Sequence, residues 1–430
     1  MTAMKPMRQD TSTTKERFAA MFASLRRSRD FRIFFLAQFG SNIGTWMQIT
    51  GLSWVVLDMT GSASKLGLVL AVETLPVLLL GPFAGSVVDR YDVRRLTVAT
   101  QSGLAAIVVL LAVLQLTGRL DYLTTLILSF LFGALLAVDS PARQSLLPEI
   151  VDARNISNAI AMNAVSLNGS SLLGPALGGL IVAWAGAAWC FVLNGISFAV
   201  VAGALLALRP QGRIAQTDPQ TSPQDDSTAR FGVVLHQVAR TPIIRDALLM
   251  MALVGTFTYE FPVTLPLLAR ESFEAGPTLY GLFFAAAGVG ATVWGLRLAG
   301  QKDHGRTALT NAAMVLGAFL LITAWMPVPI AAVASFVLVG AASVRFMALA
   351  NAAVLENAPP QFRGRIMSLW HICFQGSTLI GGPAIGYVAA ALGARWSLAA
   401  GAAAAIIAGL LGRWSLLRER SGSQPAMATQ

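Results

Sequence analysis

Residues 66–117, LGLVLAVETLPVLLLGPFAGSVVDRYDVRRLTVATQSGLAAIVVLLAVLQLT, form two apolar runs around a short charged segment. The runs cover about residues 66–88 and 97–117, and a helix needs about 20 apolar residues to cross a bilayer core about 30 Å thick. The segment between them is rich in arginine, and Lys and Arg mark cytoplasmic loops of membrane proteins. The pattern therefore predicts two transmembrane helices joined by a cytoplasmic loop.

The composition of the whole chain extends this pattern. Of the 430 residues, 55% are hydrophobic and 12% are charged, and the mean hydropathy is +0.64. A typical soluble protein has about 25% charged residues. We therefore predict an all-α membrane protein, and soluble enzymes and nucleic-acid binders are poor candidates. The formal net charge of +10 is explained by basic cytoplasmic loops beside anionic lipid.

Twelve apolar stretches are long enough to be transmembrane helices. They cover about residues 33–57, 66–88, 97–117, 122–141, 157–183, 187–208, 243–265, 278–299, 308–326, 328–350, 365–390 and 394–415. Without a tight turn at residues 326–329 the number would be eleven. Most Lys and Arg residues fall on one side when both termini are cytoplasmic, which predicts that orientation in the inner membrane. The predicted units are an N-terminal segment (1–30), two six-helix bundles (31–208 and 242–416), a cytoplasmic linker (209–241) and a tail (417–430).

Sequence signals recur between the two halves at a nearly constant offset. GPALGG at residues 174–179, in the fifth stretch, matches GPAIG at residues 382–386, in the eleventh, 208 positions later. Residues 85–90 after the second stretch match residues 299–304 after the eighth, 214 positions later. Both pairs join stretch n to stretch n+6. This repeat predicts two pseudo-symmetric bundles of six helices, an arrangement typical of transporters.

The segment GSVVDRYDVRR contains the candidate gate residues Gly85, Asp89, Arg90, Arg94 and Arg95. Gly85 permits a close helix approach, and a carboxylate at a helix end can hold a cation or the N-terminus of another helix. The alternative is that the arginines only follow the positive-inside rule.

The spacing of this segment resembles the signature loop of the major facilitator superfamily, Gly-x-x-x-Asp-Arg-x-Gly-x-Arg-Arg, with Asp92 where the family usually has glycine. The resemblance implies the major facilitator fold. It also implies a conformational gate in which Asp89 contacts the start of the eleventh helix, where Arg363 and Arg365 lie.

Two further segments narrow the resemblance. The residues Gly174, Pro175, Gly178 and Gly179 resemble a motif of antiporters and exporters, and they predict a kink and a close helix crossing; packing alone is the alternative. The segment DSPARQSLLPEIV after the fourth stretch, which starts at Asp139, is similar to the loop of the enterobactin-exporter-like, or transmembrane secretion effector, branch, as is the start of the first helix from residue 32. We include Asp139 among the gate residues. The branch exports siderophores, macrolides and other drugs.

Two carboxylates, Glu73 and Glu260, lie within the apolar stretches and away from their cytoplasmic ends. Such a group costs about 2.5–3.5 kcal/mol on insertion scales and is usually paired or functional. Glu73 has Ala287 as its counterpart in the repeat, so the fold does not require a carboxylate there. Because desolvation favours a neutral carboxyl group, we expect proton coupling at Glu73 first and at Glu260 second. The alternatives are a structural hydrogen bond or ion pair for Glu73 and a water-exposed helix end for Glu260.

Polar and aromatic side chains provide candidates for a substrate cavity, which the resemblance places between helices 1, 4, 7 and 10. Some recur at helical spacing and either face water or bond neighbouring helices. Arg345 holds an anionic cargo or snorkels to the inner face, and His371 is a titratable or a structural group. The candidates are Gln38, Asn42, Thr45, Trp46, Tyr259, Arg345 and His371.

The sequence favours proton-driven efflux of amphipathic small molecules, drug-like or siderophore-like, by alternating access. An importer or facilitator of a small metabolite on the same fold is the alternative, and a non-transporting membrane receptor is the alternative of another class. Three scattered histidines, two isolated cysteines and the lack of a Walker motif predict no catalytic residue, metal or cofactor. We expect a monomer that interacts with substrate, protons and membrane lipid.

Overall fold

The computed structural model describes residues 29–151, 156–207, 231–298 and 305–422, and the regular structure in these ranges is helical. The first half contains α3 (Arg29–Thr60), α4 (Ala63–Arg90), α5 (Val93–Leu116), α6 (Tyr122–Ile150), α7 (Ile156–Ala185) and α8 (Ala187–Ala207). The second half contains α9 (Phe231–Arg240), α10 (Pro242–Phe257), α11 (Phe261–Leu267), η2 (Leu268–Ser272), α12 (Pro277–Leu298), α13 (Arg306–Ala324), α14 (Pro329–Asn357), η3 (Pro360–Phe362), α15 (Arg363–Gln375), α16 (Thr378–Leu392) and α17 (Ala394–Gly422). Nearly all of the predicted N-terminal segment, most of the linker and the end of the tail lie outside the described residues, as do residues 299–304 of the repeat.

The length and apolar character of the helices confirm a membrane protein. Among the described residues, nine helices are long and apolar enough to cross a bilayer, and α7 adds a shorter apolar part, Gly169–Ala185. The helix α3 is not in this set, and polar residues such as Gln38, Asn42 and Gln48 occur along it. The helices α15 and α16 are also outside the set, because the predicted eleventh helix is interrupted between Gln375 and Thr378 and each part is short.

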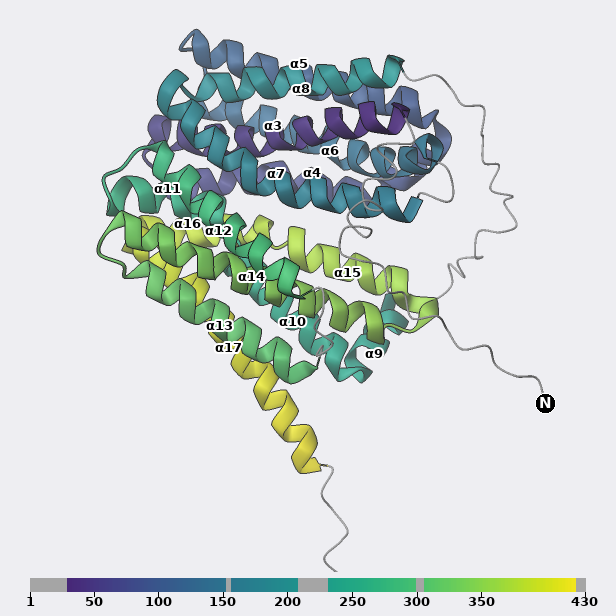
Figure 1. The fold of residues 1–430 in the computed structure, drawn as a ribbon, viewed down its shortest axis with the longest axis vertical. Coiled ribbons are helices and arrows are strands. Elements are labelled where there is room, and N and C mark those ends of the chain that lie inside the picture. Colours follow the sequence, from purple (N-terminus) through teal and green to yellow (C-terminus); the bar gives the residue numbers. More distant parts are fainter. Residues whose placement is uncertain (1–28, 152–155, 208–230, 299–304, 423–430) are drawn as a thin grey trace, which may run out of the picture.

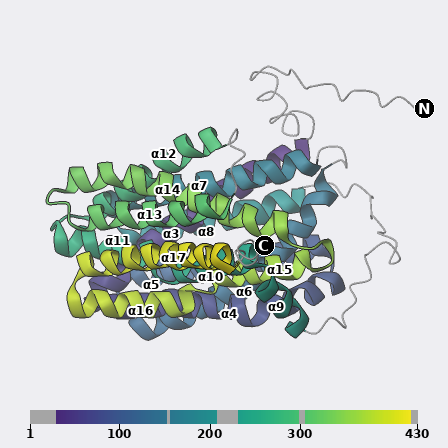
Figure 2. The same ribbon diagram turned by 90° about the horizontal axis from the view of Figure 1, so that it is seen from below.

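The helices lie roughly side by side, with α3–α8 in the upper part of Figure 1 and α10–α17 in the lower part. Figure 2 shows the same long helices with a common axis direction. We call the end at which α3 and α10 begin the linker end, and the end at which α3 meets α4 and α13 meets α14 the distal end. Between the two parts of the molecule, α4 packs on α16 and α7 packs on α12.

Glycines allow the same helix crossing to occur twice. A Cβ atom at Gly133 on α6 would overlap the carbonyl oxygen of Glu73 on α4, and one at Gly340 on α14 would overlap the carbonyl oxygen of Ala287 on α12. Glu73 and Ala287 are the pair 214 positions apart. The backbones of α4 and α6 therefore touch in the same way as those of α12 and α14.

A second repeated contact joins the two parts of the molecule near the distal end. On α4, a Cβ atom at Gly67 would overlap the carbonyl of Gly382 and lie 3.0 Å from the nitrogen of Pro383 on α16. On α12, a Cβ atom at Gly281 would lie 2.9 Å from the carbonyl oxygen of Pro175 on α7. These residues are again related by offsets of 214 and 208. We call the two contacts the glycine seams.

The predicted end of the fourth helix was wrong. The segment from Asp139 was expected to be a loop, but α6 continues through it to Ile150. Within this segment, an ion pair between Asp139 and Arg143 spans one turn of the helix. The last residues of the predicted linker form α9, whose Val234 and Val238 are buried.

Two predicted helices are interrupted. The helix α10 ends at Phe257, and the next helix, α11, begins at Phe261 with Pro262 in its first turn. Proline has no N–H to continue the hydrogen-bond pattern of a helix, which explains a break before it. The other interruption separates α15 from α16 at residues 376–377.

Candidate substrate cavity, carboxylates and gates

A cavity of about 300 Å³ opens between α3, α6 and α7 in the linker-end half of the molecule. Most of its lining side chains are polar, although two are apolar. The lining residues are Phe34, Gln38, Asn42, Ser140, Arg143, Gln144, Asn163 and Leu167. Three helices thus bring amide, hydroxyl and guanidinium groups to one space of the size that suits a small ligand.

The predicted polar stripe on α3 both lines this cavity and bonds neighbouring helices. The Gln38 side-chain amide donates to Asn42 Oδ1 at 2.9 Å, and the Asn42 amide donates to Ser166 Oγ on α7 at 3.2 Å. Gln38 Oε1 is buried and has no hydrogen-bond partner among the described residues. Both interpretations of the stripe therefore apply to Asn42, whereas Gln38 lines the cavity and forms its hydrogen bond within α3.

The cavity contains one arginine that is held in place by a buried carboxylate. Asp139 is fully buried and accepts hydrogen bonds from the Thr100 hydroxyl at 2.7 Å and from the Gln101 amide at 2.9 Å. Its second oxygen lies 2.7 Å from Arg143 Nε, and the Arg143 side chain remains 21% exposed. Asp139, predicted as a gate residue, here joins α5 to α6 and orients Arg143. Sequence reasoning did not select Arg143, although the spacing of four residues from Asp139 was a signal for an ion pair on one helix face.

Two more predicted cavity residues on α3 have other neighbours. The Thr45 hydroxyl donates to the carbonyl of Ser41 within the helix, at 3.0 Å. A Cβ atom at Gly174 on α7 would touch Trp46 Cβ, so Trp46 packs against the predicted α7 motif. Neither residue lines the cavity at the linker end.

The candidates in the second half are dispersed. The Tyr259 hydroxyl donates to the carbonyl of Ser343 at 3.3 Å, and the Arg345 guanidinium lies over the Trp294 ring at 5.8 Å from its centroid. His371 on α15 is exposed. The structure does not bring these three residues to the cavity on α3, α6 and α7.

Glu260 lies where two interrupted helices meet. It forms part of the break between α10 and α11, and it is only 2% exposed. A Cβ atom at Gly381 on α16 would lie 2.8 Å from Glu260 Oε1, which has no hydrogen-bond partner among the described residues. The Thr378 side chain lies within hydrogen-bonding reach of the carboxyl group. Glu260 is therefore a buried carboxylate between the two breaks and not a water-exposed helix end.

Glu73 has a different environment. It lies in the continuous helix α4 and is partly exposed, and its backbone packs against Gly133 at the repeated crossing. The two candidate carboxylates therefore differ in both burial and local backbone structure.

The predicted gate segment ends α4 and begins α5. Arg94 donates to the carbonyl oxygens of Leu205 and Leu206 at 2.8 and 2.9 Å and so caps the end of α8. Asp92 accepts a hydrogen bond from Arg95 N at 2.7 Å and caps the start of α5, which explains an aspartate where the superfamily motif has glycine.

The gate contact at Asp89 is not formed. Asp89 is exposed and makes no hydrogen bond or ion pair within the part of the chain that the structure describes. Gly85 has open space around its Cα, and Arg90 and Arg363 are exposed, whereas Arg365 is partly buried. The contact that the family resemblance implies between Asp89 and the start of α15 is not formed in this conformation.

The two parts of the molecule are also joined by an ion pair near the distal end. Arg270 on η2 donates to Asp58 at the end of α3 at 2.9 Å, and both side chains are exposed. The predicted α7 motif lies at the same end, where a Cβ atom at Gly178 would be 2.9 Å from Thr50 of α3 and one at Gly179 would be 2.9 Å from Gly281 of α12. This confirms close helix crossings at the motif. Sequence reasoning did not identify the ion pair, because Asp58 and Arg270 are far apart in the chain.

The chain matches known proteins over most of its length. The sequence model of the transmembrane secretion effector family matches residues 19–428. The enterobactin exporter EntS of Salmonella typhimurium is 26% identical over 344 residues, which cover 79% of this chain and 81% of the exporter. The staphyloferrin A transporter of Staphylococcus aureus is 26% identical over 264 residues, which cover 61% of this chain and 65% of that protein.

Solved structures show the same fold. A bacterial homologue of the human lysosomal transporter Spinster, in an inward-facing and unoccupied conformation, superposes with a TM-score of 0.73 at 14% identity, over 95% of this chain and 99% of that one. The nucleoside transporter NupG superposes with a TM-score of 0.69 at 12% identity, over 90% of this chain and 99% of that one. The chain therefore belongs to the transmembrane secretion effector family of the major facilitator superfamily, whose members are integral membrane transporters and not enzymes.

Proposed function

We propose that this protein is a proton-driven exporter of amphipathic small molecules that works by alternating access. In this proposal twelve helices span the inner membrane as two pseudo-symmetric bundles, residues 31–208 and 242–416, and both termini are cytoplasmic. The repeated glycine contacts at offsets of 214 and 208 support the two-bundle arrangement. The asymmetric distribution of Lys and Arg supports the orientation, which makes the linker end cytoplasmic.

The observation that carries the proposal is the cavity with an oriented arginine. Arg143 is fixed by Asp139, and its remaining N–H groups lie in a space of about 300 Å³ beside Gln38 and Asn42. A guanidinium binds carboxylate, catecholate or phosphate oxygen atoms with directed hydrogen bonds. The cavity therefore suits a cargo with anionic oxygen atoms. Siderophores have this chemistry, and two relatives of the chain are named for siderophore transport.

We propose that the described conformation is open toward the cytoplasm. The glycine seams and the ion pair between Asp58 and Arg270 hold the two parts together at the distal end. The cavity lies toward the linker end, where Asp89 has no hydrogen-bond or ion-pair partner among the residues that the structure describes. During transport the distal contacts would separate while the Asp89 gate closes.

The coupling ion in the proposal is a proton carried by a carboxyl group. The burial of Glu260 and its place between two helix breaks favour it over the partly exposed Glu73. A change in the angle between α10 and α11, or between α15 and α16, would expose Glu260 to one side or the other. The order of the two candidates is thus the reverse of the order that the sequence suggested.

The test is uptake into inside-out membrane vesicles with an imposed pH gradient. The lumen of such vesicles corresponds to the outside of the cell, so an exporter accumulates cargo when the lumen is acidic. A panel of catecholate siderophores, hydroxycarboxylate siderophores and uncharged drugs identifies the cargo class. We expect uptake of an anionic cargo to require the gradient and to fall at least tenfold in Arg143→Gln. The exposed Arg297 on α12 provides a matched control, Arg297→Gln, which should transport normally. Accumulation only in right-side-out vesicles would instead indicate an importer.

A further inference from the structure

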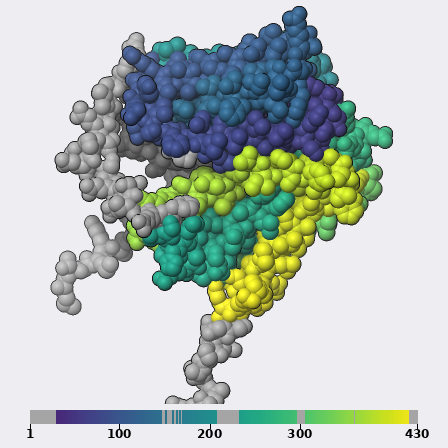
Figure 3. Space-filling view, turned by 180° about the vertical axis from the view of Figure 1, so that it is seen from behind, coloured from purple at the N-terminus to yellow at the C-terminus, as the bar shows by residue number. Residues whose placement is uncertain are grey.

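A groove lies between α10 and α17 at the linker end, on a different face of the molecule from the cavity with Arg143. Its volume is about 440 Å³. Charged side chains occupy one end, and apolar side chains form walls that continue along both helices toward the middle of the apolar spans. Figure 3 shows α17, in yellow, against the teal helices of the second half.

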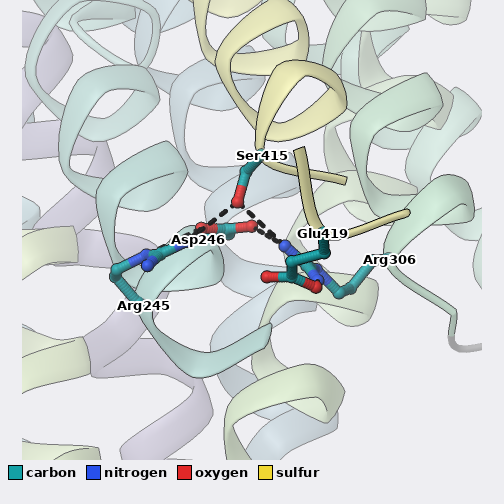
Figure 4. Close-up of polar contacts among 5 residues, drawn as sticks. All are labelled: Arg245, Asp246, Arg306, Ser415 and Glu419. Carbon is teal, nitrogen blue, oxygen red and sulfur yellow. Dashed lines mark hydrogen bonds and ion pairs between the residues drawn. The ribbon is translucent and has the colours of Figure 1, made fainter. Parts of the chain in front are cut away.

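A network of ion pairs forms the charged end of the groove (Figure 4). Arg306 on α13 binds both Asp246 on α10 and Glu419 on α17. Arg245 donates to Asp246 at 3.0 Å and to the Ser415 hydroxyl at 2.8 Å. These contacts join three helices and pair both carboxylates with arginine.

One further arginine at this end has no carboxylate partner. The Arg418 guanidinium lies over the Trp414 ring at 3.5 Å from its centroid, and within the described ranges it makes no ion pair. Arg245 and Arg418 line the groove together with the two carboxylates Asp246 and Glu419. Arg306 lies outside the lining but pairs with both carboxylates, so the ion-pair cluster contains three positive and two negative groups. This end of the groove therefore has one net positive charge and unused guanidinium N–H groups.

The walls beyond the charged end are apolar and uncovered. Leu249 on α10 is 62% exposed, Leu411 on α17 is 55% exposed and Trp414 is 52% exposed. Both helices are among the apolar spans, and the groove lies where α10 begins and α17 leaves its span. Tryptophan at such a boundary is typical of the membrane–water interface. The groove thus combines a cationic end at the interface with an apolar wall that faces acyl chains.

We propose that this groove binds one anionic phospholipid of the inner leaflet. Its phosphate accepts hydrogen bonds from Arg418 and Arg245, and one acyl chain lies along Leu249 and Leu411. The net positive charge favours a net-negative headgroup over a zwitterionic one. The choice of leaflet rests on the proposed orientation of the protein, whereas the groove and its charges do not.

The experiment measures lipid contact at Trp414 in the full-length protein reconstituted into liposomes. Brominated acyl chains quench tryptophan fluorescence on contact, and the Trp414 signal is the difference between the wild type and Trp414→Phe, since the chain contains nine tryptophans. Dibrominated phosphatidylglycerol is compared with dibrominated phosphatidylcholine and phosphatidylethanolamine. We expect a preference for phosphatidylglycerol that falls about fivefold in Arg418→Gln, the factor that one arginine near an anionic surface contributes.

Arg413 provides the matched control, because it is an exposed arginine on the same helix that does not line the groove. Arg413→Gln should keep the preference. Native mass spectrometry of the same variants, counting retained phosphatidylglycerol, gives a second measurement that does not depend on fluorescence. Equal quenching by all three lipids, a preference for phosphatidylethanolamine, or equal losses in Arg413→Gln and Arg418→Gln would overturn the proposal. None of these readouts requires transport, so they are independent of the cargo and its direction.

Discussion

The glycine seam between α4 and α16 makes a direct test of alternating access, through the substitution Gly67→Ala. The added methyl group would overlap the carbonyl of Gly382 and lie 3.0 Å from the nitrogen of Pro383. Both are backbone atoms, so no side-chain rotation relieves the overlap. The two helices must therefore move apart to make room for the methyl group, and the close contact of the seam is lost.

The size of the effect follows from the cost of overpacking. Inserting a methyl group into a closely packed interface costs about 1–3 kcal/mol. This cost applies only to the conformation in which the distal end is closed, because the seam is apart in the other conformation. The ratio of the two populations should therefore shift roughly 5- to 150-fold toward the outward-open state. Transport should fall because each cycle must pass through the closed seam.

The measurement is a distance distribution between spin labels at the distal end. The exposed residues Lys65, near the start of α4, and Leu392, at the end of α16, provide the positions, Lys65→Cys and Leu392→Cys, in a cysteine-free background. Gly81 on α4 has no heavy atom within 4 Å of an added Cβ atom. Gly81→Ala is therefore the matched control, and we expect it to leave the distances and transport unchanged.

Gly67→Ala should lengthen the dominant distance and lower the rate of uptake. An unchanged distribution in Gly67→Ala would refute the idea that the seam closes the distal end. Equal shifts in Gly67→Ala and Gly81→Ala would show that the effect comes from helix propensity and not from the seam. Alanine is more favourable than glycine in a helix by about 1 kcal/mol.

Three further predictions concern charged groups. Asp139→Asn removes the carboxylate that orients Arg143. We expect the free energy of unfolding to fall by about 2 kcal/mol, which is less than the usual cost of breaking a buried ion pair because Arg143 is partly exposed. Binding of an anionic cargo should be lost as well. If the Asp139→Asn variant binds the same cargo with wild-type affinity, this role of Asp139 is contradicted. Glu260→Gln should abolish pH-driven accumulation but preserve exchange of labelled for unlabelled cargo, whereas Glu73→Gln should retain coupling; the opposite pattern in vesicle uptake would transfer the proton site to Glu73. Asp89→Asn should insert and fold normally, since its side chain is exposed and has no partner within the described part of the chain, yet it should lose most transport. Full activity of this variant would remove Asp89 from the gate.

The repeat illustrates what the sequence could predict. The offsets of 208 and 214, taken from two short motifs, anticipated which residues occupy equivalent contacts, because Gly67 packs against Pro383 and its counterpart Gly281 packs against Pro175. Apolar length likewise predicted the helices, since bilayer thickness constrains it directly. Both signals are local in the chain or periodic along it.

The features that the sequence did not predict depend on contacts between distant segments. The family resemblance implied a loop from Asp139, but α6 continues through this segment, with the Asp139–Arg143 ion pair along it and Asp139 bonded to α5. Glu260 looked like a helix end near water, and only the packing of α16 against the break in the seventh span buries it. Hydropathy could not distinguish these environments, because it averages over one segment and contains no information about its neighbours.

The repeat also reveals where the two halves differ, and the difference bears on the cargo. The crossing of α6 and α14 relates Gly133 to Gly340, an offset of 207. At the same offset, Asp139 corresponds to Phe346 and Arg143 to Ala350, and both of these second-half residues are fully buried. The second half therefore presents apolar groups where the first half presents an ion pair. Phe346 and Ala350 have no exposed surface, so at this level only the first half offers a charged side chain, Arg143, to a ligand. The proposed contact with an anionic cargo is therefore confined to the first half, and the second half supplies packing at the equivalent positions.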